Sequence, residues 1–486
     1  MNAIAKVLQW PADDTDMLPL ALWDAPGLAA AMGGVASADF QVSGVEIDSR
    51  DVIEGDLFFA LKGEAMDGHR FVESAFAKGA TAAVVDRPID GPHILVADTS
   101  SALELLAKAA RTRSAATIIG VTGSVGKTGV KEALFAALER SSRGAAHRSI
   151  KSYNNHVGVP LSLSRMSARA KFGVFEMGMN HAGEIAALTR QARPHIAVIT
   201  TIAPAHIENL GSEKAIAAAK AEIFEGLEPG GVAIIPADSP HFARLKEAAE
   251  QRGVAVVSFG WAAHADVRLL DAVAAPGGGS LVTADLGDRR LCYTVAAPGD
   301  HWIVNSLAVM AAVRAAGGDL GAAGLALAEL GGLKGRGERS EIALLGGGTA
   351  LLIDESYNAN PASMRATLAQ LGATPAKRRI AVLGAMKELG EFGPAFHAAL
   401  AEPLLLAAVD FTVLVGDEMR ALADELGKSG AAKLGKTIPF AHCANPVAAR
   451  EALEKFGVES GDAILVKGSN SVGLGALVAA LAGKED

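Results

Sequence analysis

Short apolar segments alternate with Ala- and Leu-rich stretches along most of the chain, and this alternation constrains the fold more than any other feature. Strand–helix alternation is typical of parallel sheets covered by helices, so the sequence predicts an α/β protein. In the first part of the chain the expected strands are 44–48, 57–60, 81–85 and 94–97. In the middle part they are 117–120, 173–177, 196–200, 232–236 and 254–258. In the last part they are 350–354, 380–384, 411–416 and 463–467.

The chain length and two local changes of composition predict three domains. A chain of 486 residues is long enough for roughly three domains of about 150 residues each. A helical stretch at 101–113 is expected to open the second domain, and the glycine-rich segment 331–337 is typical of a linker into the third. We therefore expect domains at 1–98, 99–333 and 334–486.

Charge and cysteine content exclude several classes of function. The chain has 45 Lys and Arg against 54 Asp and Glu, a net charge of −9, which argues against a nucleic-acid partner held by a basic surface. An anionic small ligand remains compatible with this charge, because a single loop can be locally positive. The two cysteines, Cys292 and Cys443, fit no CxxC or zinc spacing, so we expect no disulfide framework and a reducing cytosol.

The high hydrophobic content does not predict a membrane protein. Hydrophobic residues make up 50% of the chain, yet no uncharged apolar run reaches the roughly 18 residues of a membrane helix. The nearest run, 403–416, is interrupted by Asp410. The N-terminal sequence MNAIAKVLQWPADD lacks the apolar core and cleavage site of a signal peptide. We expect a cytoplasmic protein without membrane insertion.

The strongest local motif lies between the strand at 117–120 and the helical stretch that begins near Val130. The sequence VTGSVGKT links them, and a strand, a glycine-rich turn, a Lys-Thr pair and a helix are together typical of a phosphate-binding loop. Gly123 and Gly126 would let backbone N–H groups converge on phosphate oxygens, and the helix N-terminus would add its dipole. Lys127 is expected to reach the β- and γ-phosphates, and the Thr128 hydroxyl to bind Mg²⁺.

Two details narrow the interpretation of this loop. The strict GxxxxGK[ST] spacing would place the first glycine at Val121, whereas it stands at Gly120, so a purely structural turn is the alternative. No GxGxxG followed by an acidic residue about 20 residues later is present, which argues against a dinucleotide-dependent oxidoreductase.

In the last domain each expected strand runs directly into polar or glycine-bearing residues. The transitions are IDESYNAN, LGAMKELG, VGDE and VKGSNS. Ligands of open parallel sheets bind outside the carboxyl ends of the strands. This domain is therefore expected to supply half of a ligand cleft, with ordinary turn composition as the alternative for any one strand.

Three residues of the middle domain are candidates for chemistry beside the loop. Glu176 ends the strand at 173–177, where a carboxylate would suit Mg²⁺, and an exposed strand-end glutamate is the alternative. His206 follows the strand at 196–200, and a structural histidine is its alternative. Lys220 lies among small residues in KAIAAAKAEIF, where burial would lower the pKa of its amine. On local sequence alone, a solvated lysine on a helix face is the favoured interpretation of Lys220.

A set of ordered motifs carries a family resemblance over nearly the whole chain. They are VEIDSR and FFALKGEAMDGHRF in the first domain; GVTGSVGKT, YNNHVGVPLSL, FEMGMNHAGEI, AHIENLGS, AKAEIF and GDHWIVNSLA in the second; and GRGER, IDESYNANP, AVLGAMKELGE and VKGSNS in the third. With these motifs the chain resembles the ATP-dependent Mur ligases of peptidoglycan assembly. EMGMNHAGEI and SYNANP make it similar to the MurF type, and the DNPR signature of the MurE type is absent.

The resemblance implies a fold and a reaction. The fold is a small N-terminal α/β domain that binds UDP, a central P-loop-type ATPase domain with a mostly parallel sheet, and a C-terminal Rossmann-like domain. The reaction joins D-alanyl-D-alanine to UDP-N-acetylmuramoyl-tripeptide through an acyl phosphate. It consumes ATP and requires Mg²⁺, with two Mg²⁺ ions bound at the active site. The implied protein is a cytoplasmic ligase, and we expect a monomer.

The resemblance also implies roles for individual residues. The ATP site would comprise Thr122, Gly123, Ser124, Val125, Gly126, Lys127, Thr128, Asn305, Arg336 and Glu355. The catalytic residues would be Lys127, Glu176, His206 and Lys220, and the metal ligands Thr128, Glu176, His206 and Lys220. The substrates would contact Ser49, Arg50, Lys62, Asp67, His69, Asn154, Asn155, Tyr357, Asn358, Asn360, Lys467 and Ser469. Lys220 falls at the family's carbamylated lysine, so the resemblance overturns the solvated interpretation; a carbamate converts a cationic amine into an anionic oxygen ligand.

Some positions depart from the family pattern. Pro236 replaces a common asparagine, Glu355 replaces a usual aspartate and Ala385 replaces a frequent aspartate; TTIAPAH also departs from the more frequent TNIGxAH. None removes a phosphate-binding or metal-binding group, so we expect an active enzyme. The alternatives are a MurE-type or folylpolyglutamate-type ligase, and a catalytically inactive nucleotide-binding regulator.

Overall fold

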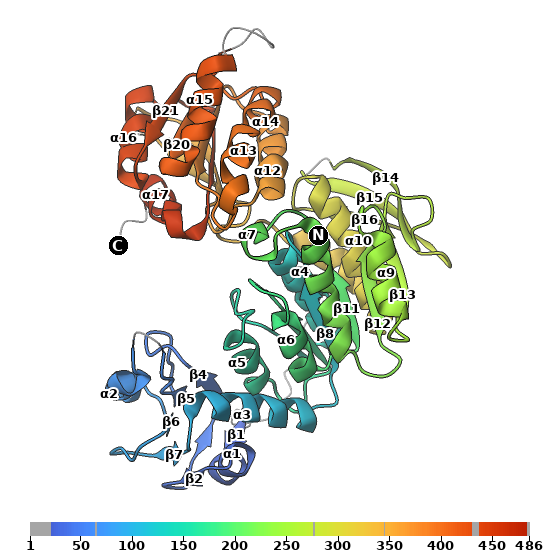
Figure 1. Cartoon of the computed structure of the whole chain (residues 1–486), viewed down its shortest axis with the longest axis vertical. Coiled ribbons are helices and arrows are strands. Elements are labelled where there is room, and N and C mark those ends of the chain that lie inside the picture. The colour runs from blue at the N-terminus through green and yellow to red at the C-terminus, as the bar shows by residue number, and fades with distance from the viewer. Residues whose placement is uncertain (1–20, 64–65, 276–277, 345, 430–436, 484–486) are drawn as a thin grey trace, which may run out of the picture. The chain divides into compact units, whose positions relative to one another are not determined.

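A computed structural model describes residues 21–63, 66–275, 278–344, 346–429 and 437–483 (Figure 1). The N-terminal segment on which the expectation about a signal peptide rests lies outside these residues. The chain divides into two compact units, one formed by the residues up to Arg113 with Leu163–Ala168, the other by Ser114–Ser162 with Arg169–Asp486.

The first unit is built on a small sheet whose neighbouring strands are mostly parallel. In spatial order its strands are β2 (Val35–Ala36), β7 (His93–Leu95), β6 (Ala82–Val85), β5 (Asp56–Phe59) and β4 (Gly44–Glu46). Only β2 runs antiparallel to its neighbour. A second pair joins β1 (Trp23–Asp24) to β3 (Gln41–Val42). The helices are α1 (Ala25–Met32), α2 (Val72–Ala77) and α3 (Thr99–Arg113), and Phe58, Val72 and Val85 form part of the core.

Helix α3 belongs to this first unit, which differs from the domain boundary expected at 98/99. Its buried face includes Leu103, Leu106 and Ala110, and the helix packs against α1. Burial of that face against α1 ties α3 to the first unit, whereas the sequence predicted that this helix opens the second domain. The next element, β8, starts the second unit.

The second unit contains a nine-stranded sheet. In spatial order its strands are β16 (Arg290–Val295), β15 (Ser280–Asp285), β14 (Val267–Ala274), β13 (Ala255–Gly260), β12 (Val232–Pro236), β11 (Ile196–Ile199), β8 (Thr117–Thr122), β10 (Phe172–Glu176) and β9 (Ala146–Arg148). The strands from β14 to β9 are parallel, and β14, β15 and β16 form an antiparallel extension. The helices are α4 (Lys127–Ser142), α5 (Gly158–Ser164), α6 (Glu184–Ala192), α7 (Ile207–Leu210), α8 (Glu213–Ala221), α9 (Phe242–Glu250), α10 (Asp300–Ala315) and α11 (Leu320–Glu329).

One face of the nine-stranded sheet carries a large apolar core. Helices α4, α10 and α11 pack together there and bury Leu134, Leu307 and Leu327 with Val121 and Ile234 of the sheet. This packing fixes the N-terminus of α4 at the carboxyl end of β8. The helix that follows the phosphate loop is therefore held by core contacts along its whole length.

The same unit also contains a six-stranded sheet. In spatial order its strands are β17 (Glu338–Ala343), β18 (Thr349–Glu355), β22 (Ala463–Lys467), β19 (Arg379–Gly384), β20 (Phe411–Val415) and β21 (Phe440–Cys443). All neighbours are parallel except the pair of β17 and β18. Its helices are α12 (Pro361–Ala373), α13 (Gly393–Ala398), α14 (Ala401–Leu406), α15 (Arg420–Ser429), α16 (Pro446–Phe456) and α17 (Leu474–Leu481). In Figure 1, α16 and α17 cover one face of this sheet and α12, α13 and α14 the other.

The prediction of an α/β protein with mostly parallel sheets is confirmed. Two expected strands, 232–236 and 463–467, match β12 and β22 to the residue. The antiparallel extension β14–β16 was not expected. Its strands alternate buried and exposed residues, and exposed apolar side chains such as Val273 give no simple polar–apolar period.

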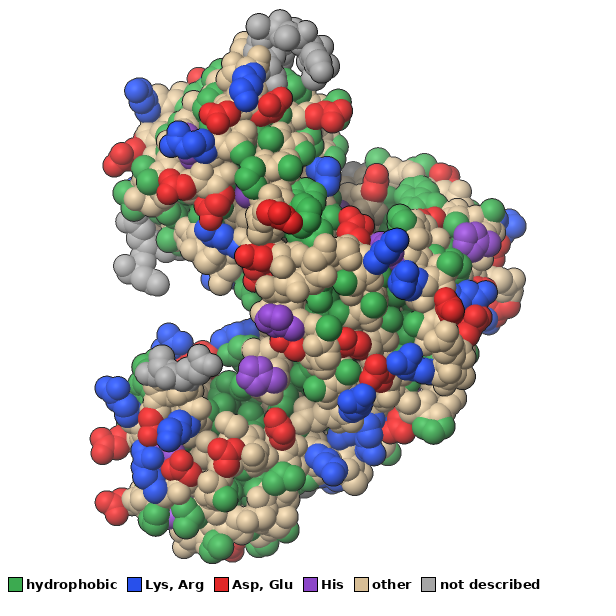
Figure 2. Space-filling model, viewed as in Figure 1, with side chains coloured by type: hydrophobic (Ala, Val, Ile, Leu, Met, Phe, Trp, Pro, Cys, Tyr) green, Lys and Arg blue, Asp and Glu red, His purple; other side chains and the backbone are tan. Residues whose placement is uncertain are grey.

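The visible surface carries interspersed charges of both signs without a broad basic area (Figure 2). This distribution agrees with the net charge of −9. Across the part of the chain that the structure describes, no helix is both long and apolar enough to cross a bilayer.

Candidate active site

The phosphate loop is a sharp turn between β8 and α4 that requires glycine at two positions. Gly123 has φ +149°, and a Cβ there would lie 1.9 Å from the Thr200 hydroxyl oxygen. Gly126 has φ +87° and is the residue immediately before α4, and a Cβ there would lie 2.8 Å from Asn305 Nδ2. Both backbone conformations and both close contacts disfavour any side chain. The loop thus presents backbone groups and the N-terminus of α4 to the cavity.

The first two residues of α4 place a cation and a hydroxyl at the loop. Lys127 lines a cavity of about 270 Å³, and its Nζ donates to the Gly123 carbonyl oxygen at 2.8 Å. Burial lowers the pKa of Lys127, the nearby Glu176 carboxylate opposes that shift, and the Arg336 cation adds to it. Thr128 is buried and follows Lys127 on the same helix turn. A nearby anion stabilises the charged form of a lysine whose pKa is lowered by burial. A bound phosphate group would be such an anion.

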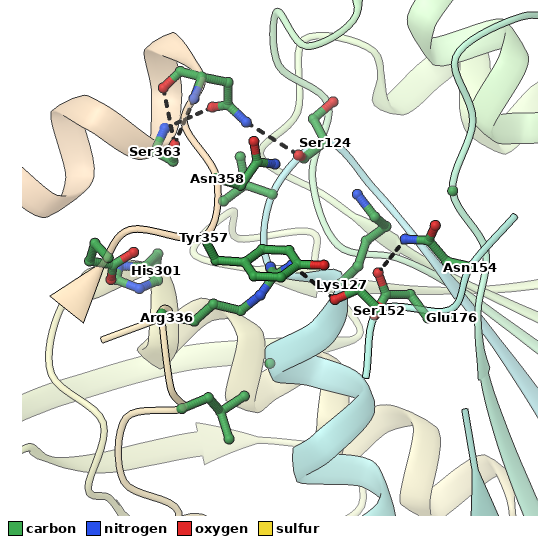
Figure 3. Close-up of a pocket in the computed structure, with 18 of the residues that line it drawn as sticks. Ser124, Lys127, Ser152, Asn154, Glu176, His301, Arg336, Tyr357, Asn358 and Ser363 are labelled. Atoms are coloured by element: carbon green, nitrogen blue, oxygen red, sulfur yellow. Dashed lines mark hydrogen bonds between the residues drawn. The ribbon is translucent and has the colours of Figure 1, made fainter. Parts of the chain in front are cut away.

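Glu176 is fixed at the end of β10 by two side-chain hydrogen bonds. Asn154 Nδ2 donates to its Oε1 at 2.7 Å (Figure 3). Thr128 Oγ1 donates to its Oε2 at 2.8 Å. The residue is 1% exposed. A buried carboxylate held by a hydroxyl and an amide has a defined orientation beside the loop. The expected placement of Glu176 next to Thr128 is what the structure shows.

Lys220 lies near the end of α8 and is almost completely buried, with 2% of its surface exposed. Its side chain lines the same cavity as Lys127 and Glu176. Burial lowers the pKa of Lys220 well below its ordinary value, and the Lys127 charge lowers it further. Such an environment favours the neutral amine. The expectation from local sequence, a solvated lysine, is therefore wrong.

His206 precedes α7 and has left-handed backbone geometry, with φ +58°. It lines the cavity, and its Nδ1 lies against the carboxylate of Glu388, which belongs to the six-stranded half of the unit. This pairing lowers the pKa of Glu388. The histidine is therefore partnered by a carboxylate and still faces the cavity.

The six-stranded sheet supplies the other wall of the cavity from its strand ends. Lys467 ends β22, is 2% exposed, and donates to Glu355 Oε2 at 3.3 Å and to the Asn358 carbonyl oxygen at 2.9 Å. Burial lowers the pKa of Lys467 in spite of the opposing Glu355 charge. The guanidinium of Arg336 lies 4.2 Å from the Tyr357 ring centroid, and its Nη2 donates to Ser152 Oγ at 3.1 Å (Figure 3). Of the four strand ends expected to form a ligand cleft, IDESYNAN and VKGSNS line this cavity, LGAMKELG lines a neighbouring one, and VGDE lines neither of the two.

Asn360 connects the start of α12 to the phosphate loop. Its side-chain oxygen accepts from the Ser363 backbone N–H at 2.9 Å in a capping box, and its Nδ2 donates to the Ser124 carbonyl oxygen at 3.4 Å. The same amide thus caps a helix and contacts the loop. Asn305 of α10 also lies against the loop beside Gly126.

The cavity brings together most of the residues expected at the ATP and dipeptide sites. Those that line it are Ser124, Val125, Gly126, Lys127, Asn154, Glu176, His206, Lys220, Asn305, Arg336, Glu355, Tyr357, Asn358, Asn360 and Lys467. Ser469 lines a neighbouring cavity with Asn358, Asn360 and Lys387. Asn155 stabilises the start of α5, because its side-chain oxygen accepts a hydrogen bond of 2.9 Å from the Gly158 N–H. Thr122 ends β8 and Gly123 begins the turn after it, directly before the lining residue Ser124.

Several lining residues were not expected from the sequence, among them Ser152, His301, Trp302 and Ser363. His301 stands four positions before Asn305 on α10, so helical spacing within GDHWIVNSLA could have indicated it. Ser152 stands two positions before Asn154, the first residue of the NN motif, and Ser363 is the third residue of α12. Nothing in the local sequence distinguishes these two serines from other surface serines.

The candidate UDP-binding residues of the first unit divide into two groups. Asp67 and His69 bind each other, with Asp67 Oδ1 2.7 Å from His69 Nδ1, and Arg87 Nη2 donates to Asp67 Oδ2 at 2.7 Å. The hydrogen bond from Arg87 is the main cause of a lowered pKa at Asp67. Arg50 and Lys62 are exposed, although Arg50 pairs with Asp48. Ser49, which directly precedes Arg50 in the sequence, is buried.

Comparison with known proteins matches all three parts of the chain. Models of the Mur ligase family, catalytic domain, the Mur ligase middle domain and the Mur ligase, glutamate ligase domain match residues 41–114, 121–313 and 338–470. A UDP-N-acetylmuramoyl-tripeptide–D-alanyl-D-alanine ligase of Synechocystis sp. is 38% identical over 456 residues, covering 92% of this chain and 93% of that protein. This chain belongs to the Mur ligase family. The ligase of the same name from Escherichia coli is 34% identical, covering 92% of this chain and 96% of that protein.

Solved Mur ligase structures share the fold. A MurF crystal structure from Acinetobacter baumannii superposes with a TM-score of 0.80 at 31% identity, covering 96% of this chain and 100% of that chain. The MurF ligase from Thermotoga maritima in complex with ADP gives a TM-score of 0.71 at 26% identity, covering 91% of this chain and 98% of that chain.

Proposed function

We propose that this Mur ligase joins D-alanyl-D-alanine to UDP-N-acetylmuramoyl-tripeptide with consumption of ATP, giving UDP-N-acetylmuramoyl-pentapeptide, ADP and phosphate. The supporting observation is the cavity in which the phosphate loop, Glu176 and Lys220 face the strand ends that carry Arg336 and Lys467. Relatives 34–38% identical over nine-tenths of the chain carry the name of that ligase. The proposed place of the reaction is the cytoplasm, and the proposed state is a monomer.

The reaction requires activation because a carboxylate is a poor electrophile toward an amine at neutral pH. The tripeptide carboxylate would attack the γ-phosphorus of ATP, giving an acyl phosphate and ADP. The dipeptide amine would then attack the acyl carbon, and the tetrahedral intermediate would expel phosphate. The protein's part is to position the reactants and to neutralise the charge that develops during both steps.

The phosphate loop fits a nucleotide triphosphate by its backbone as well as by its charge. A Cβ at Gly123 would collide with Thr200 and one at Gly126 with Asn305, so both positions keep the loop backbone free of side chains. Lys127 and Arg336 would neutralise the transferring phosphoryl group from two sides. Asn305 would contact the adenine, and Glu355 would face the ribose. Because burial lowers the pKa of Lys127, a bound phosphate would stabilise the charged form of this lysine.

The donor set also fits Mg²⁺. Among the described residues no group of three or more His, Cys, Asp or Glu side chains could hold a metal by itself. Mg²⁺ commonly binds one or two carboxylates and fills its remaining positions with water and substrate phosphates. Thr128, Glu176, His206 and a carbamylated Lys220 would hold two such ions. When bound, Mg²⁺ would supply charge stabilisation for phosphoryl transfer.

The environment of Lys220 supports the carbamate. Formation of a carbamate needs a neutral amine, and burial together with the Lys127 charge favours that form. The product would be an anion close to Lys127. The carbamate would also add a second negative group to the metal site, beside the buried Glu176 carboxylate.

The two ends of the cavity would take the two amide-forming substrates. Asn154 would orient the tripeptide end, with Asn155 supporting it through the start of α5. Tyr357, Asn358, Asn360, Lys467 and Ser469 would hold the dipeptide. Ser49, Arg50 and Lys62 would contact the UDP group, while Asp67 and His69 would shape that surface through their mutual hydrogen bond.

Phosphate release by the purified protein tests the proposal. ATP, Mg²⁺, UDP-N-acetylmuramoyl-tripeptide and D-alanyl-D-alanine together should give phosphate and UDP-N-acetylmuramoyl-pentapeptide in equal amounts. Omission of either amide-forming substrate should abolish release. Turnover only with a diamino acid or with glutamate would assign a different ligase reaction. Nucleotide binding without turnover of any amine would indicate an inactive regulator.

A further inference from the structure

Helix α4 carries a second lysine, Lys131, that the proposed reaction does not use. Lys131 is 0% exposed and stands one turn beyond Lys127 and Thr128. Its Nζ donates to the carbonyl oxygens of Ser149 at 2.9 Å and of Lys151 at 2.7 Å. It also lies 2.8 Å from Glu132 Oε1. A fully buried ammonium group is costly unless it is paired and hydrogen-bonded, and three acceptors satisfy this one.

The two carbonyl groups belong to segment 149–154, which links β9 to the turn before α5. The segment has neither helical nor strand hydrogen bonding of its own, and Lys151 has left-handed geometry with φ +52°. Such geometry is uncommon for a residue other than glycine. Backbone hydrogen bonds hold part of the segment: the Tyr153 N–H donates to the Ile150 carbonyl oxygen, and the two ends of the segment bond to Val174 and Gly178. Lys131 adds two further contacts from a helix that is fixed by the core.

Segment 149–154 carries side chains that orient the charged groups of the site. Ser149 Oγ accepts from the Glu176 backbone N–H at 3.2 Å, and Asn154 Nδ2 donates to the Glu176 carboxylate at 2.7 Å. Ser152 Oγ accepts from Arg336 Nη2 at 3.1 Å (Figure 3). The same hydroxyl lies 3.5 Å from Thr128 Oγ1. One short segment thus touches the carboxylate, the guanidinium and the hydroxyl of the proposed site.

We propose that Lys131 is a positioning residue that fixes segment 149–154 and thereby the orientation of Glu176 and Arg336. Lys131 contacts the backbone of the segment and does not line the cavity, so it would act on the site only through Ser149, Ser152 and Asn154. The expected effect on turnover rests on the proposed ligase function. The expected effect on the conformation of segment 149–154 does not. The two can be measured separately.

Hydrogen exchange of the free protein tests the structural part. Lys131→Met keeps the length and apolar stem of the side chain and removes the donors. Amide exchange in segment 149–154 should become at least about tenfold faster, while exchange in α4 and β8 stays unchanged, because only the segment loses its support. The matched control is Leu453→Ala in α16, a buried substitution remote from the loop that should leave exchange in the segment unchanged.

Steady-state kinetics test the link to the site. Lys131→Met should lower kcat about 10- to 100-fold, because small displacements of positioned groups cost rates of that order. KM for D-alanyl-D-alanine should change little. The double variant Lys131→Met with Ser152→Ala should be no slower than the slower single variant, since both changes break the same connection. Leu453→Ala should lower thermal stability without lowering kcat.

Two results would overturn the proposal. One is exchange that rises equally in the segment and in α4, which would mean general destabilisation. The other is a multiplicative loss of kcat in the double variant, which would mean that Lys131 acts independently of Ser152. If Lys131→Met does not fold, Lys131→Arg keeps the charge and displaces the two carbonyl groups, and it should show the same segment-limited increase in exchange. Absence of ligase turnover in the wild type would refute the proposed function and leave the exchange result standing.

Discussion

At the scale of single residues, Lys127 is the group whose removal should be most damaging to chemistry. Its ammonium lies at the start of α4 and would neutralise charge on the transferring phosphoryl group. Lys127→Ala should therefore lose about 10³-fold or more in kcat. Lys246→Ala, at an exposed lysine of α9, is the control and should retain full turnover. Near-normal ligation by Lys127→Ala would refute the phosphate-loop assignment.

Lys220 offers a second prediction at this scale, because burial and the Lys127 charge lower the pKa of its amine well below the ordinary value. Lys220→Ala should fold normally and lose most activity, and Lys220→Arg should also fail because a guanidinium stays cationic and cannot form a carbamate. Short carboxylic acids should restore part of the rate of Lys220→Ala by supplying oxygen ligands. Lys214→Arg, on the exposed side of the same helix, should remain active.

The measurement that decides the chemistry at Lys220 is the mass and electron density of this side chain in active, metal-loaded enzyme. A plain amine there, or wild-type turnover by Lys220→Arg, would exclude the carbamate.

At the scale of elements, the start of α12 combines a structural and a functional contact in Asn360. Asn360→Ala removes the helix cap and should cost about 1 kcal/mol of stability. Asn360→Asp keeps the cap oxygen, loses the donor to the Ser124 carbonyl and adds negative charge beside the phosphate loop. This variant should keep its thermal stability and raise KM for ATP about tenfold, which corresponds to about 1.4 kcal/mol.

A matched cap separates the two effects. Asn445 caps α16 with a hydrogen bond of 3.0 Å to the Ala448 N–H and lies outside the cavity. Asn445→Ala should show the stability loss of Asn360→Ala and no change in KM for ATP. Equal KM values for wild type and Asn360→Asp would show that the contact with Ser124 has no part in nucleotide binding.

At the scale of the whole molecule, the choice of amine follows from the strand ends of the six-stranded sheet. The SYNANP segment supplies Tyr357, Asn358 and Asn360 to the cavity, and the sequence has no DNPR segment for a diamino acid. D-Alanyl-D-alanine should be accepted, and free diaminopimelate or lysine should not. Phosphate release with each amine at equal concentration measures this. Equal or faster turnover with a diamino acid would place the protein among MurE-type ligases.

The sequence predicted the parts of this molecule that local chemistry determines. Strands such as β12 and β22 are short apolar runs with polar ends, and the glycines of the phosphate loop are required by backbone geometry. The burial of Lys220 could not be read from its neighbours, because it depends on packing of α8 in the folded unit. The contact of Ser152 with Arg336 joins residues 184 positions apart and has no local signal. The domain limits 1–98, 99–333 and 334–486 remain a proposal.

The position of β22 has a consequence for how the protein is made. This strand lies between β18 and β19, although it follows both of them and also β20 and β21 along the chain. A nascent chain emerges at about 5–20 residues per second, so β18 and β19 leave the ribosome several seconds before the strand that joins them. Until β22 arrives, each exposes an unpaired edge on which another chain could add. Since Lys467 ends β22, the cavity acquires its last cation only when synthesis of this sheet is nearly finished.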